Sequence, residues 1–437
     1  MRKFLYLILF VMTLCVFCCS CSQKTNDVKK TSSQHEKKLK SVPNNNTKED
    51  VISEEDLEKG YDLPVSAQEN EEATRDSMQI MSGLEHIYRN ADKGDSLNVV
   101  LDNKSICKMI KKIKQQGYSV TVSEDYSNME NYKRFSSFLA KAQKKQKGSG
   151  VIYEVHSEGS IGREKFIYDG KDMFLLASNA SWDDNGKPII TFVSYTRIKK
   201  WRYSRKGWFC YELCVPEYPE VTEMVDGSCL IRIKPMSDNK RKLSRKCVRG
   251  LAYQGNNILC SNWDQEHMQK IDYNGLYEYL YAMKYKKKFN GKKYPSGIPK
   301  DQFEQLIMEY LPVSREDIEK YASYNEKKKT YDWMRLGCFN YAPNFFGTSI
   351  PEVTKIKHNS NGTVTLTVDA VCEMVLCNEA VITHELTVKF NKESIIATNA
   401  PSENHINIKL LVIISITTKN IATRIQIITS IIASPPF

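Results

Sequence analysis

Apolar residues recur at helical spacing in three segments of the chain. Residues 76–90 and 102–116 each place their apolar side chains on one face of a helix, and residues 128–147 repeat the pattern. Between the second and third segments, apolar and polar residues alternate over residues 118–122, which is typical of a short strand. We therefore expect three helices and one strand in this region.

From Gly150 onward the spacing changes to strict alternation. Six such stretches predict consecutive strands, at residues 151–157, 163–169, 172–178, 188–198, 200–204 and 208–215. Three of the breaks between them contain a turn dipeptide: Asp169-Gly170, Asn185-Gly186 and Lys206-Gly207. Connections this short join antiparallel strands, so we expect an antiparallel meander with the preceding helices packed on it. Together they predict an α+β unit over residues 76–260.

A second, smaller α+β unit is expected over residues 261–392. Its clearest signal is the helical pair in residues 298–322, which Pro312 divides. Ser314 and Asp317 then have the spacing of a capping box. The strands that follow are a hairpin turning at Asn361-Gly362 and an alternating stretch at residues 380–390. Before this unit, the basic stretch SDNKRKLSRKCVRG (residues 237–250) is interpreted as a solvated helix or loop.

The amino end has the pattern of an export signal. Met1, Arg2 and Lys3 precede an apolar run over residues 4–17, which is too short for a comfortable membrane span. The stretch VFCCSCSQKT that follows resembles a bacterial lipobox, with Cys21 as the lipidated residue and Cys19 as the second choice. A plain secretory leader is the alternative, and a metal site is disfavoured because no histidine lies nearby. We expect a signal peptide at residues 1–21.

The segment after the leader is polar and has few large apolar residues. Residues 22–75 cannot bury enough surface to offset their ordering entropy, so they are interpreted as a disordered tether. The net charge of the whole chain is +11, with a pI near 8.8. A basic protein on the outer face of the cell membrane is attracted to an anionic lipid surface or to an anionic wall polymer. Nucleic acid is not expected as a partner, because no nucleic-acid-binding motif is present.

Nine cysteines follow the leader, and an odd number leaves at least one unpaired. An exported protein can form disulfides. Cys372 and Cys377 have a spacing that could close a small loop between two strands, so a bridge between them is one hypothesis. The other is that several cysteines are buried thiols that act as small apolar residues.

The sequence carries few signals of catalytic chemistry. None of the common hydrolase, nucleotide-binding or metalloprotease motifs occurs, and we expect no enzyme activity, no cofactor and no metal. His156 and His384 lie in predicted strands and are interpreted as surface or hydrogen-bonded strand residues. The run Asp183-Asp184-Asn185-Gly186 is interpreted as a hairpin turn rather than a calcium loop. Glu154 and Asp172 would suit a hydrolytic pair, but nothing in the sequence brings them together.

Two groups of side chains are candidate binding surfaces. Cations alternate with aromatic residues on adjacent strands, a pattern that can bind an anionic polymer or lipid headgroup; the candidate residues are Arg197, Lys199, Lys200, Trp201, Arg202 and Trp208. The alternative is an ordinary strand with core aromatics and solvated charges. Likewise Tyr277, Tyr281 and Tyr285 recur every four residues. This stripe is interpreted as core, with a sugar-stacking face as the alternative.

The helical pair in residues 298–322, the hairpin at residues 351–371 and the strand ITHELTVKF resemble a family of uncharacterised lipoproteins from gut Clostridia, of the Lachnospiraceae kind. The stretches GREKFIYDGKDMFLL and GLYEYLYAMKYKKKFNGKKYP fit the same family. The resemblance implies a membrane-anchored surface protein of a Gram-positive cell with a domain of unknown function. It brings no activity and no functional residues.

Residues 393–437 depart from that family. From His405 to Phe437 there are 11 isoleucines, no acidic residue and no glycine, a composition that suggests a frameshifted or recombined end. Two stretches, residues 406–416 and 423–432, predict an added hairpin. A transmembrane span is disfavoured because Lys419 and Arg424 interrupt the apolar sequence.

Taken together, these patterns predict a lipid-anchored protein on the extracytoplasmic face of the membrane. Its expected role is to bind or organise something at the envelope without catalysis, with the lipid, an anionic wall polymer or an envelope protein as partners. One alternative is a wall-acting hydrolase, which requires a cleft with convergent carboxylates or a Cys–His pair. The other is a solute-binding lipoprotein, which requires repeated βαβ units that the meander does not provide.

Overall fold

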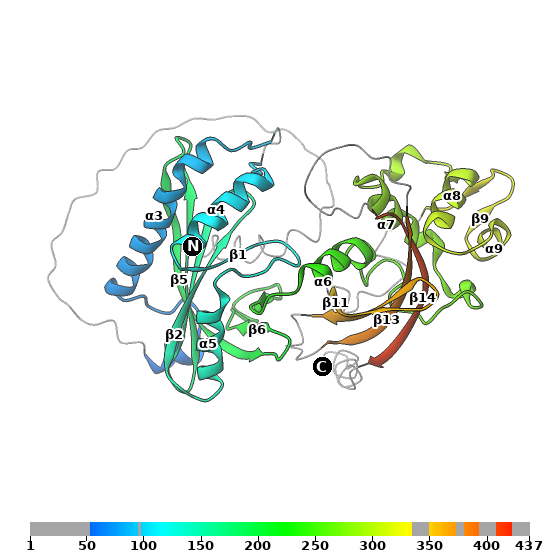
Figure 1. Ribbon diagram of the computed structural model, residues 1–437. Helices are drawn as coiled ribbons and strands as arrows, with labels where there is room; N and C mark the ends of the chain where they lie inside the picture. The colour runs from blue at the N-terminus through cyan, green and yellow to red at the C-terminus, as the bar shows by residue number, and fades with distance from the viewer. Residues whose placement is uncertain (1–52, 95–97, 334–348, 373–379, 393–407, 422–437) are drawn as a thin grey trace.

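The computed structural model describes residues 53–94, 98–333, 349–372, 380–392 and 408–421. Its elements form two groups that lie side by side, one built on a long curved sheet and one on a smaller sheet flanked by short helices (Figure 1). The mixture of helices and mainly antiparallel strands confirms the predicted α+β class. Among the described residues, no helix is both long enough and apolar enough to cross a membrane.

The first sheet has seven strands whose spatial order follows the chain. They are β1 (Ser119–Val122), β2 (Gly148–Val155), β3 (Ile161–Tyr168), β4 (Met173–Trp182), β5 (Pro188–Tyr203), β6 (Trp208–Leu213) and β7 (Ser228–Arg232). Strands β2 to β7 pair antiparallel, as predicted, whereas β1 pairs parallel to β2 at the edge. The parallel pair is possible because a helix, α5 (Tyr132–Ala142), connects its two strands.

The strand prediction differs from the structure in two places. The stretches predicted as separate strands at residues 188–198 and 200–204 form the single strand β5, in which a bulge falls between Ile198 and Lys200. A bulge interrupts the alternation of side chains without ending the strand, so it imitates a break in the sequence pattern. The short strand β7 was not predicted.

The predicted turns between strands are confirmed. Gly170, Gly186 and Gly207 all have positive φ, at 102°, 68° and 92°, where glycine is favoured. At the second turn, Asp183 accepts hydrogen bonds from the backbone N–H groups of Asn185 and Lys187 at 2.9 and 2.7 Å. The run of acidic residues there is therefore a hairpin turn, as expected.

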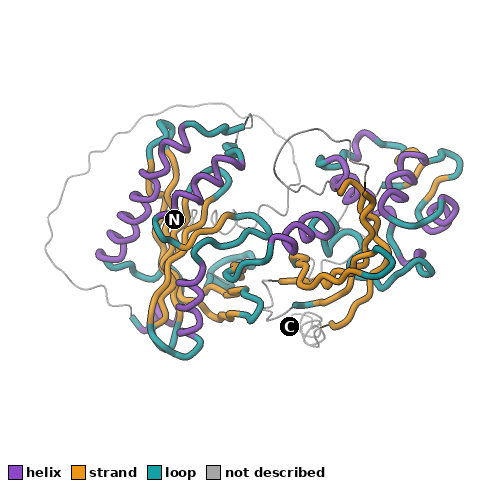
Figure 2. Tube along the Cα trace, viewed as in Figure 1, coloured by secondary structure: helices purple, strands orange, loops and turns teal. Residues whose placement is uncertain are grey.

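Helices cover both faces of the first sheet (Figure 2). Helices α3 (Ala67–Arg89) and α4 (Asn103–Gln115) pack on one face, and α5 packs on the other. On the α5 side, Phe166 of β3 lies 5.2 Å from Phe209 of β6, measured between ring centroids. These strands are not neighbours in the sheet, so the sheet curls around this aromatic cluster. The third helix is shorter than the predicted residues 128–147.

Helical structure begins before the predicted end of the tether at residue 75. A short helix, α2, spans Glu54–Lys59, and α3 begins at Ala67, where the Ser66 side chain accepts a hydrogen bond from the Glu69 N–H. The charges in this stretch suggested a solvated segment. In the structure, however, Glu72 pairs with the fully buried Arg163 of β3 at 2.9 Å. Partners on the sheet therefore stabilise residues that the composition assigned to the tether.

The second group of elements begins after β7 with mostly helical segments. These are α6 (Asp238–Leu243), the π-helical turn η2 (Ser244–Val248), α7 (Tyr273–Tyr285), α8 (Lys300–Tyr310) and α9 (Arg315–Tyr321), with short 3-10 turns at Met268–Lys270 and Gly291–Lys293. As predicted, the Ser314 side chain caps α9 by accepting a hydrogen bond from the Asp317 N–H at 3.1 Å. A small sheet of two-residue strands, β8 (Ile298–Pro299), β10 (Thr330–Tyr331) and β9 (Tyr324–Asn325), lies beside them.

The larger sheet of this group has four antiparallel strands in chain order: β11 (Ile350–His358), β12 (Thr363–Val371), β13 (Ile382–Lys392) and β14 (Ile408–Ile421). The predicted hairpin turn at Asn361-Gly362 is present, with φ at Gly362 of 79°. Strand β14 belongs to the isoleucine-rich tail and pairs with β13. The second predicted tail strand, at residues 423–432, lies outside the described residues.

Buried ionic contacts join the two groups. Glu352 of β11 pairs with Arg232 of β7 and accepts a hydrogen bond from Trp208 Nε1 at 3.0 Å. Asp369 of β12 pairs with Lys206 in the β5–β6 turn. The Tyr126 hydroxyl also donates to the carbonyl of a β11 residue, Pro351, at 2.6 Å. These contacts fix the elements on either side of α6 relative to one another.

Candidate anion-binding grooves

The basic stretch at residues 237–250 forms α6 and η2, which lie at the junction of the two groups (Figure 1). Cys247 and Val248 are fully buried in the core of the second group. Ser244 is buried as well, and its hydroxyl accepts a hydrogen bond from the Val353 N–H of β11 at 2.9 Å. One side of this segment is therefore anchored, and the cationic side chains project from the other. π-Helical turns are rare in proteins and frequently occur at functional sites.

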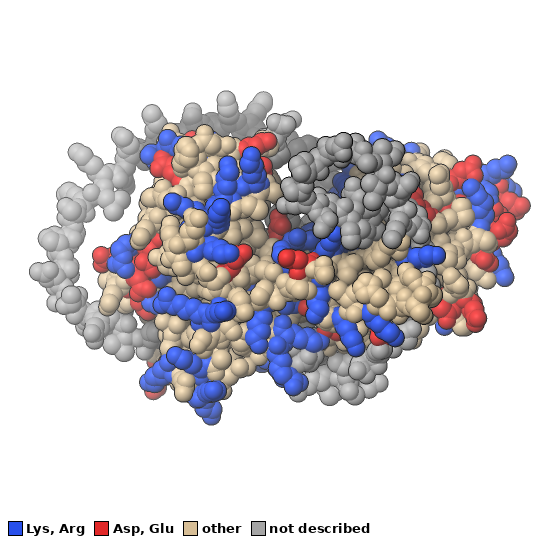
Figure 3. All heavy atoms as spheres, viewed as in Figure 1, with Lys and Arg blue, Asp and Glu red and all other residues tan. Residues whose placement is uncertain are grey.

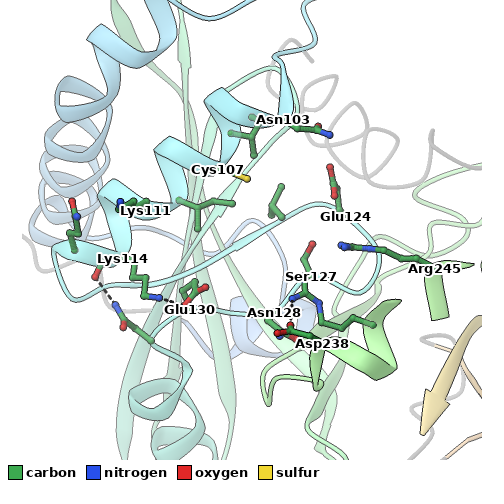
Figure 4. Close-up of a pocket in the computed structure, with 16 residues that line it drawn as sticks. Asn103, Cys107, Lys111, Lys114, Glu124, Ser127, Asn128, Glu130, Asp238 and Arg245 are labelled. Atoms are coloured by element: carbon green, nitrogen blue, oxygen red, sulfur yellow. Dashed lines mark hydrogen bonds and ion pairs between the residues drawn. The ribbon is translucent and has the colours of Figure 1, made fainter. Parts of the chain in front are cut away.

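A first groove separates α6 from α4 and has a volume of about 950 Å³. Figure 4 shows Cys107 and Lys111 on α4, with Arg245 reaching across from the opposite side toward Glu124. Its charges are mixed. The lining cations are Lys111, Lys114, Arg241 and Arg245, and the lining carboxylates are Glu124, Glu130 and Asp238. Lys114 is paired with Glu130 at 2.7 Å, which removes part of the positive charge.

A second groove, of about 980 Å³, lies on the other side of α6, against α7 and α8. Its lining is strongly basic: seven cations face two carboxylates. The cations are Arg241, Lys242, Arg245, Lys246, Arg249, Lys284 and Lys286, and the carboxylates are Asp238 and Glu309. In Figure 3, Lys and Arg atoms gather around the middle of the molecule, where the two groups of elements meet. The two grooves share Asp238, Arg241 and Arg245.

Some cations of the second groove are occupied by protein partners and some are not. Arg249 pairs with Asp125 at 3.1 Å, Lys284 pairs with Glu309, and Arg241 Nε donates to the Tyr126 carbonyl at 2.8 Å. The side chains of Lys242, Arg245 and Lys286 have no hydrogen-bond or ion-pair partner among the described residues. Burial, and then the charges of Lys242 and Lys286, lower the pKa of Lys246. An anion bound here would relieve that repulsion.

Residues 70–397 match the profile of DUF6070, a family of unknown function. This chain belongs to the DUF6070 family. The match spans most elements of both groups and includes α6 and η2, whereas β14 lies beyond it. No curated protein and no solved structure matches the chain. Membership therefore brings a domain of unknown function, as expected, and no activity.

In the structure of this DUF6070 chain, the residues predicted to form a binding surface on β5 and β6 do not lie together. Lys199 pairs with Glu217 at 3.0 Å, and Lys200 pairs with Glu212 at 3.2 Å, so their charges are balanced locally. Trp201 packs edge-on against core aromatics, at 6.0 Å from Tyr168 and 6.2 Å from Phe209. These contacts correspond to the alternative reading, in which the aromatics belong to the core.

The other members of that predicted surface lie apart. Trp208 is buried at the junction and stacks with the Arg232 guanidinium at 4.2 Å. Arg197 is half-buried beside α2, whereas Arg202 is exposed. In the tyrosine stripe, Tyr277 is fully buried and stacks on Phe303 at 5.0 Å, whereas Tyr281 is half-buried and Tyr285 is 47% exposed.

The predictions for histidines and cysteines have mixed outcomes. His384 was interpreted as a surface or hydrogen-bonded residue, which is wrong: it is 0% exposed, and neither ring nitrogen has a hydrogen-bond partner. His156 is half-buried, with Nδ1 at 3.0 Å from the Ser123 hydroxyl. Cys372 is buried at the end of β12. Its proposed disulfide partner Cys377 lies outside the described residues, as do the lipidation candidates Cys19 and Cys21.

Proposed function

We propose that this DUF6070 protein is a lipid-anchored extracytoplasmic protein that binds an anionic polymer of the cell envelope in its second groove, without catalysing a reaction. The lipobox-like stretch at the amino end, with Cys21 or Cys19 as the acylated residue, supports the anchor and the palmitate modification. The likeness to Lachnospiraceae-type lipoproteins supports a Gram-positive surface. The observation that carries the proposal is the excess of cations in the second groove.

A polymer suits this site better than a small anion. The two grooves share Arg241 and Arg245, so a chain with repeated charges would contact several cations in succession. Each exposed cation contributes only about 1 kcal/mol to binding an anionic surface, so useful affinity needs several of them. Lys242, Arg245 and Lys286 are available for such contacts because they have no other partner among the described residues.

The test compares binding of the purified full-length chain, in detergent, to isolated cell walls and to walls stripped of their phosphate polymer. We expect sedimentation with intact walls only, weakening as salt rises because exposed charges are screened. The double variant Lys242→Gln/Arg245→Gln should bind roughly thirtyfold more weakly, since each of the two charges contributes about 1 kcal/mol. Lys327→Gln/Lys328→Gln removes the same charge at exposed positions in the β9–β10 turn and should bind normally.

Three results would refute this function. One is equal binding to stripped and intact walls, and another is equal weakening by both double variants. The third is binding to vesicles of anionic lipid that exceeds binding to walls, which would make a lipid headgroup the ligand. The anchor is tested separately by radiolabelled palmitate. Label should be lost in Cys21→Ser and kept in Cys19→Ser, whereas an unlabelled parent chain would contradict lipidation.

The two alternative functions, a wall-acting hydrolase and a solute-binding lipoprotein, each require a structural feature that can be compared with this fold. A hydrolase needs convergent carboxylates, and Glu154 does not meet Asp172, the partner considered from the sequence; Asp172 instead donates its N–H to Asp169 in a turn at 2.7 Å. Glu154 does share a pocket with another carboxyl group, Glu164. A solute-binding lipoprotein needs repeated βαβ units, and among the described strands only β1 and β2 pair parallel.

A further inference from the structure

A smaller pocket opens on the α5 side of the first sheet, between the loop after β1 and strands β6 and β7. Its volume is about 270 Å³. Glu154 of β2, Glu164 of β3, Tyr211 of β6 and Cys229 of β7 line it, together with apolar side chains such as Ile152 and Ile231. The loop residues Val122, Glu124 and Ser127 also line the first groove, whereas Glu154, Glu164, Tyr211 and Cys229 line neither groove.

The strand register places the two carboxyl groups together. Glu164 pairs with Ile152, and Glu154 pairs with Gly162. Side chains two residues apart on a strand share a face, so Glu154 and Glu164 rise from the same face at diagonal positions on neighbouring strands. Gly162 itself has no side chain, and the ring of His156 approaches the space opposite Glu154, with Nε2 3.2 Å from where a Cβ of residue 162 would lie. This face is otherwise the apolar one, because Ile152 and Phe166 are part of the core cluster under α5.

Glu164 is an unusual residue for this position. Although the residue as a whole is half-buried, its Oε2 atom is inaccessible to solvent and has no hydrogen-bond partner. Burial, and then the negative charge of Glu154, raise the pKa of Glu164 to about 8. Glu154 itself accepts a hydrogen bond from the Ser123 hydroxyl at 2.8 Å. A buried carboxyl oxygen without a partner reduces stability, so its presence in a pocket points to a ligand.

The lining indicates a cationic ligand. The cation of the pocket, Arg232, is already paired with Glu352 and stacked on Trp208, so it does not neutralise the two carboxyl groups. Among the described residues, no three His, Cys, Asp or Glu side chains are grouped to hold a metal ion. The apolar walls and the ring of Tyr211 suit the carbon atoms of an organic cation. An ammonium group has three donors and can bridge two carboxylates.

We propose that this pocket binds a small primary ammonium compound between Glu154 and Glu164, and that binding releases the proton of Glu164 to solvent. The exchange is balanced, because the carboxyl group of Glu164 loses one proton to solvent and the ammonium cation takes the place of that positive charge beside the carboxylate. No covalent bond forms or breaks. The proposal does not depend on the polymer-binding function, since it uses other residues and another ligand charge.

The test is isothermal titration calorimetry of the full-length chain in detergent, with propylammonium chloride as the probe. Propanol serves as the neutral analogue of similar shape, and sodium chloride as the ionic-strength control. Repeating the titration in buffers of different ionisation enthalpy counts the protons released. Near pH 7 we expect close to one proton per propylammonium bound, and this number should fall toward zero well above pH 8. Propanol and sodium chloride should give no binding.

Two variants locate the site. Glu164→Gln should weaken propylammonium binding at least about tenfold and abolish proton release, because a buried charged partner is lost. Glu223→Gln changes an exposed carboxylate elsewhere and should bind as the parent chain does. The proposal is overturned if the parent chain does not bind propylammonium, binds propanol equally well or releases no proton. Unchanged binding by Glu164→Gln also overturns it. If that variant does not fold, the proton count on the parent chain decides alone.

Discussion

Replacing His384 by Phe should remove an acid-sensitive contribution to the stability of this protein. His384 lies on β13 with no exposed surface, and neither ring nitrogen has a hydrogen-bond partner. Its ring meets the ring of Tyr253 edge-on, with the centroids 5.8 Å apart. Because burial disfavours the charged imidazolium, the pKa falls from 6.5 to about 4. A Phe ring keeps the contact with Tyr253 and has no proton to bind.

The sign and size of the effect follow from proton binding in the folded and unfolded chains. Between pH 6.5 and 4, the unfolded chain binds a proton at His384 that the folded chain does not bind. Acid therefore favours unfolding in this window, and the full stability of the buried neutral ring is present only above pH 6.5. A pKa lowered from 6.5 to about 4 corresponds to a loss of about 3 kcal/mol when the pH has fallen to 4.

The assay is urea unfolding of the parent chain and His384→Phe in steps from pH 7.5 to pH 4. The difference between their free energies of unfolding should grow by about 3 kcal/mol in favour of the variant as pH falls. Other titrating groups cancel in this difference, including Glu164, whose raised pKa acts in the opposite direction. A constant packing penalty from the larger ring also cancels. His358→Phe, at an exposed position, is the control. A difference that does not change with pH would refute the reasoning.

Two further predictions concern the junction and the core. Glu352→Ala leaves the buried Arg232 without its carboxylate partner and should reduce the free energy of unfolding by about 3–5 kcal/mol. The double variant Arg232→Met/Glu352→Leu removes both charges and should lose much less stability. Equal losses for the two variants in urea unfolding would contradict a buried ion pair. Phe166→Ala should reduce stability by about 3–5 kcal/mol because its ring contacts three other aromatic rings, while Ile189→Ala, at an exposed position, should change it by less than about 0.5 kcal/mol. Equal losses would mean that the aromatic cluster is not the core of the curled sheet.

Most of the first sheet could be predicted because local rules determine it. Alternating apolar residues identify β2 to β6. The strands end in turns that require a positive φ, which glycine adopts at Gly170, Gly186 and Gly207. The predictions fail where the structure of a segment depends on contacts that its local sequence does not show. Glu72 looks like a tether residue until Arg163, far along the chain, is placed beside it. The bulge at Ile198 likewise divides one strand into two sequence patterns.

The basic grooves were less predictable than the fold. A short segment rich in lysine and arginine has the same sequence pattern whether it is solvated or lines a cleft. What makes Arg245 part of a groove is the position of α4 and α7 on either side of α6. That position depends on contacts such as Arg232–Glu352, between residues more than a hundred positions apart. Sequence alone therefore identified the charge but not the cavity.

The pocket lined by Glu154 and Glu164 did leave a signal in the sequence, which lies in the alternation of residues along β3. Arg163 and Lys165 lie on the face toward α3, where Glu72 pairs with both. The residue between them, Glu164, must then lie on the opposite face, which also carries Phe166 and faces the core. A carboxyl group at an apolar position of a strand contradicts the binary pattern. Such local contradictions are expected where function outweighs stability, which is why Glu164, rather than any of the exposed charges, marks the second site.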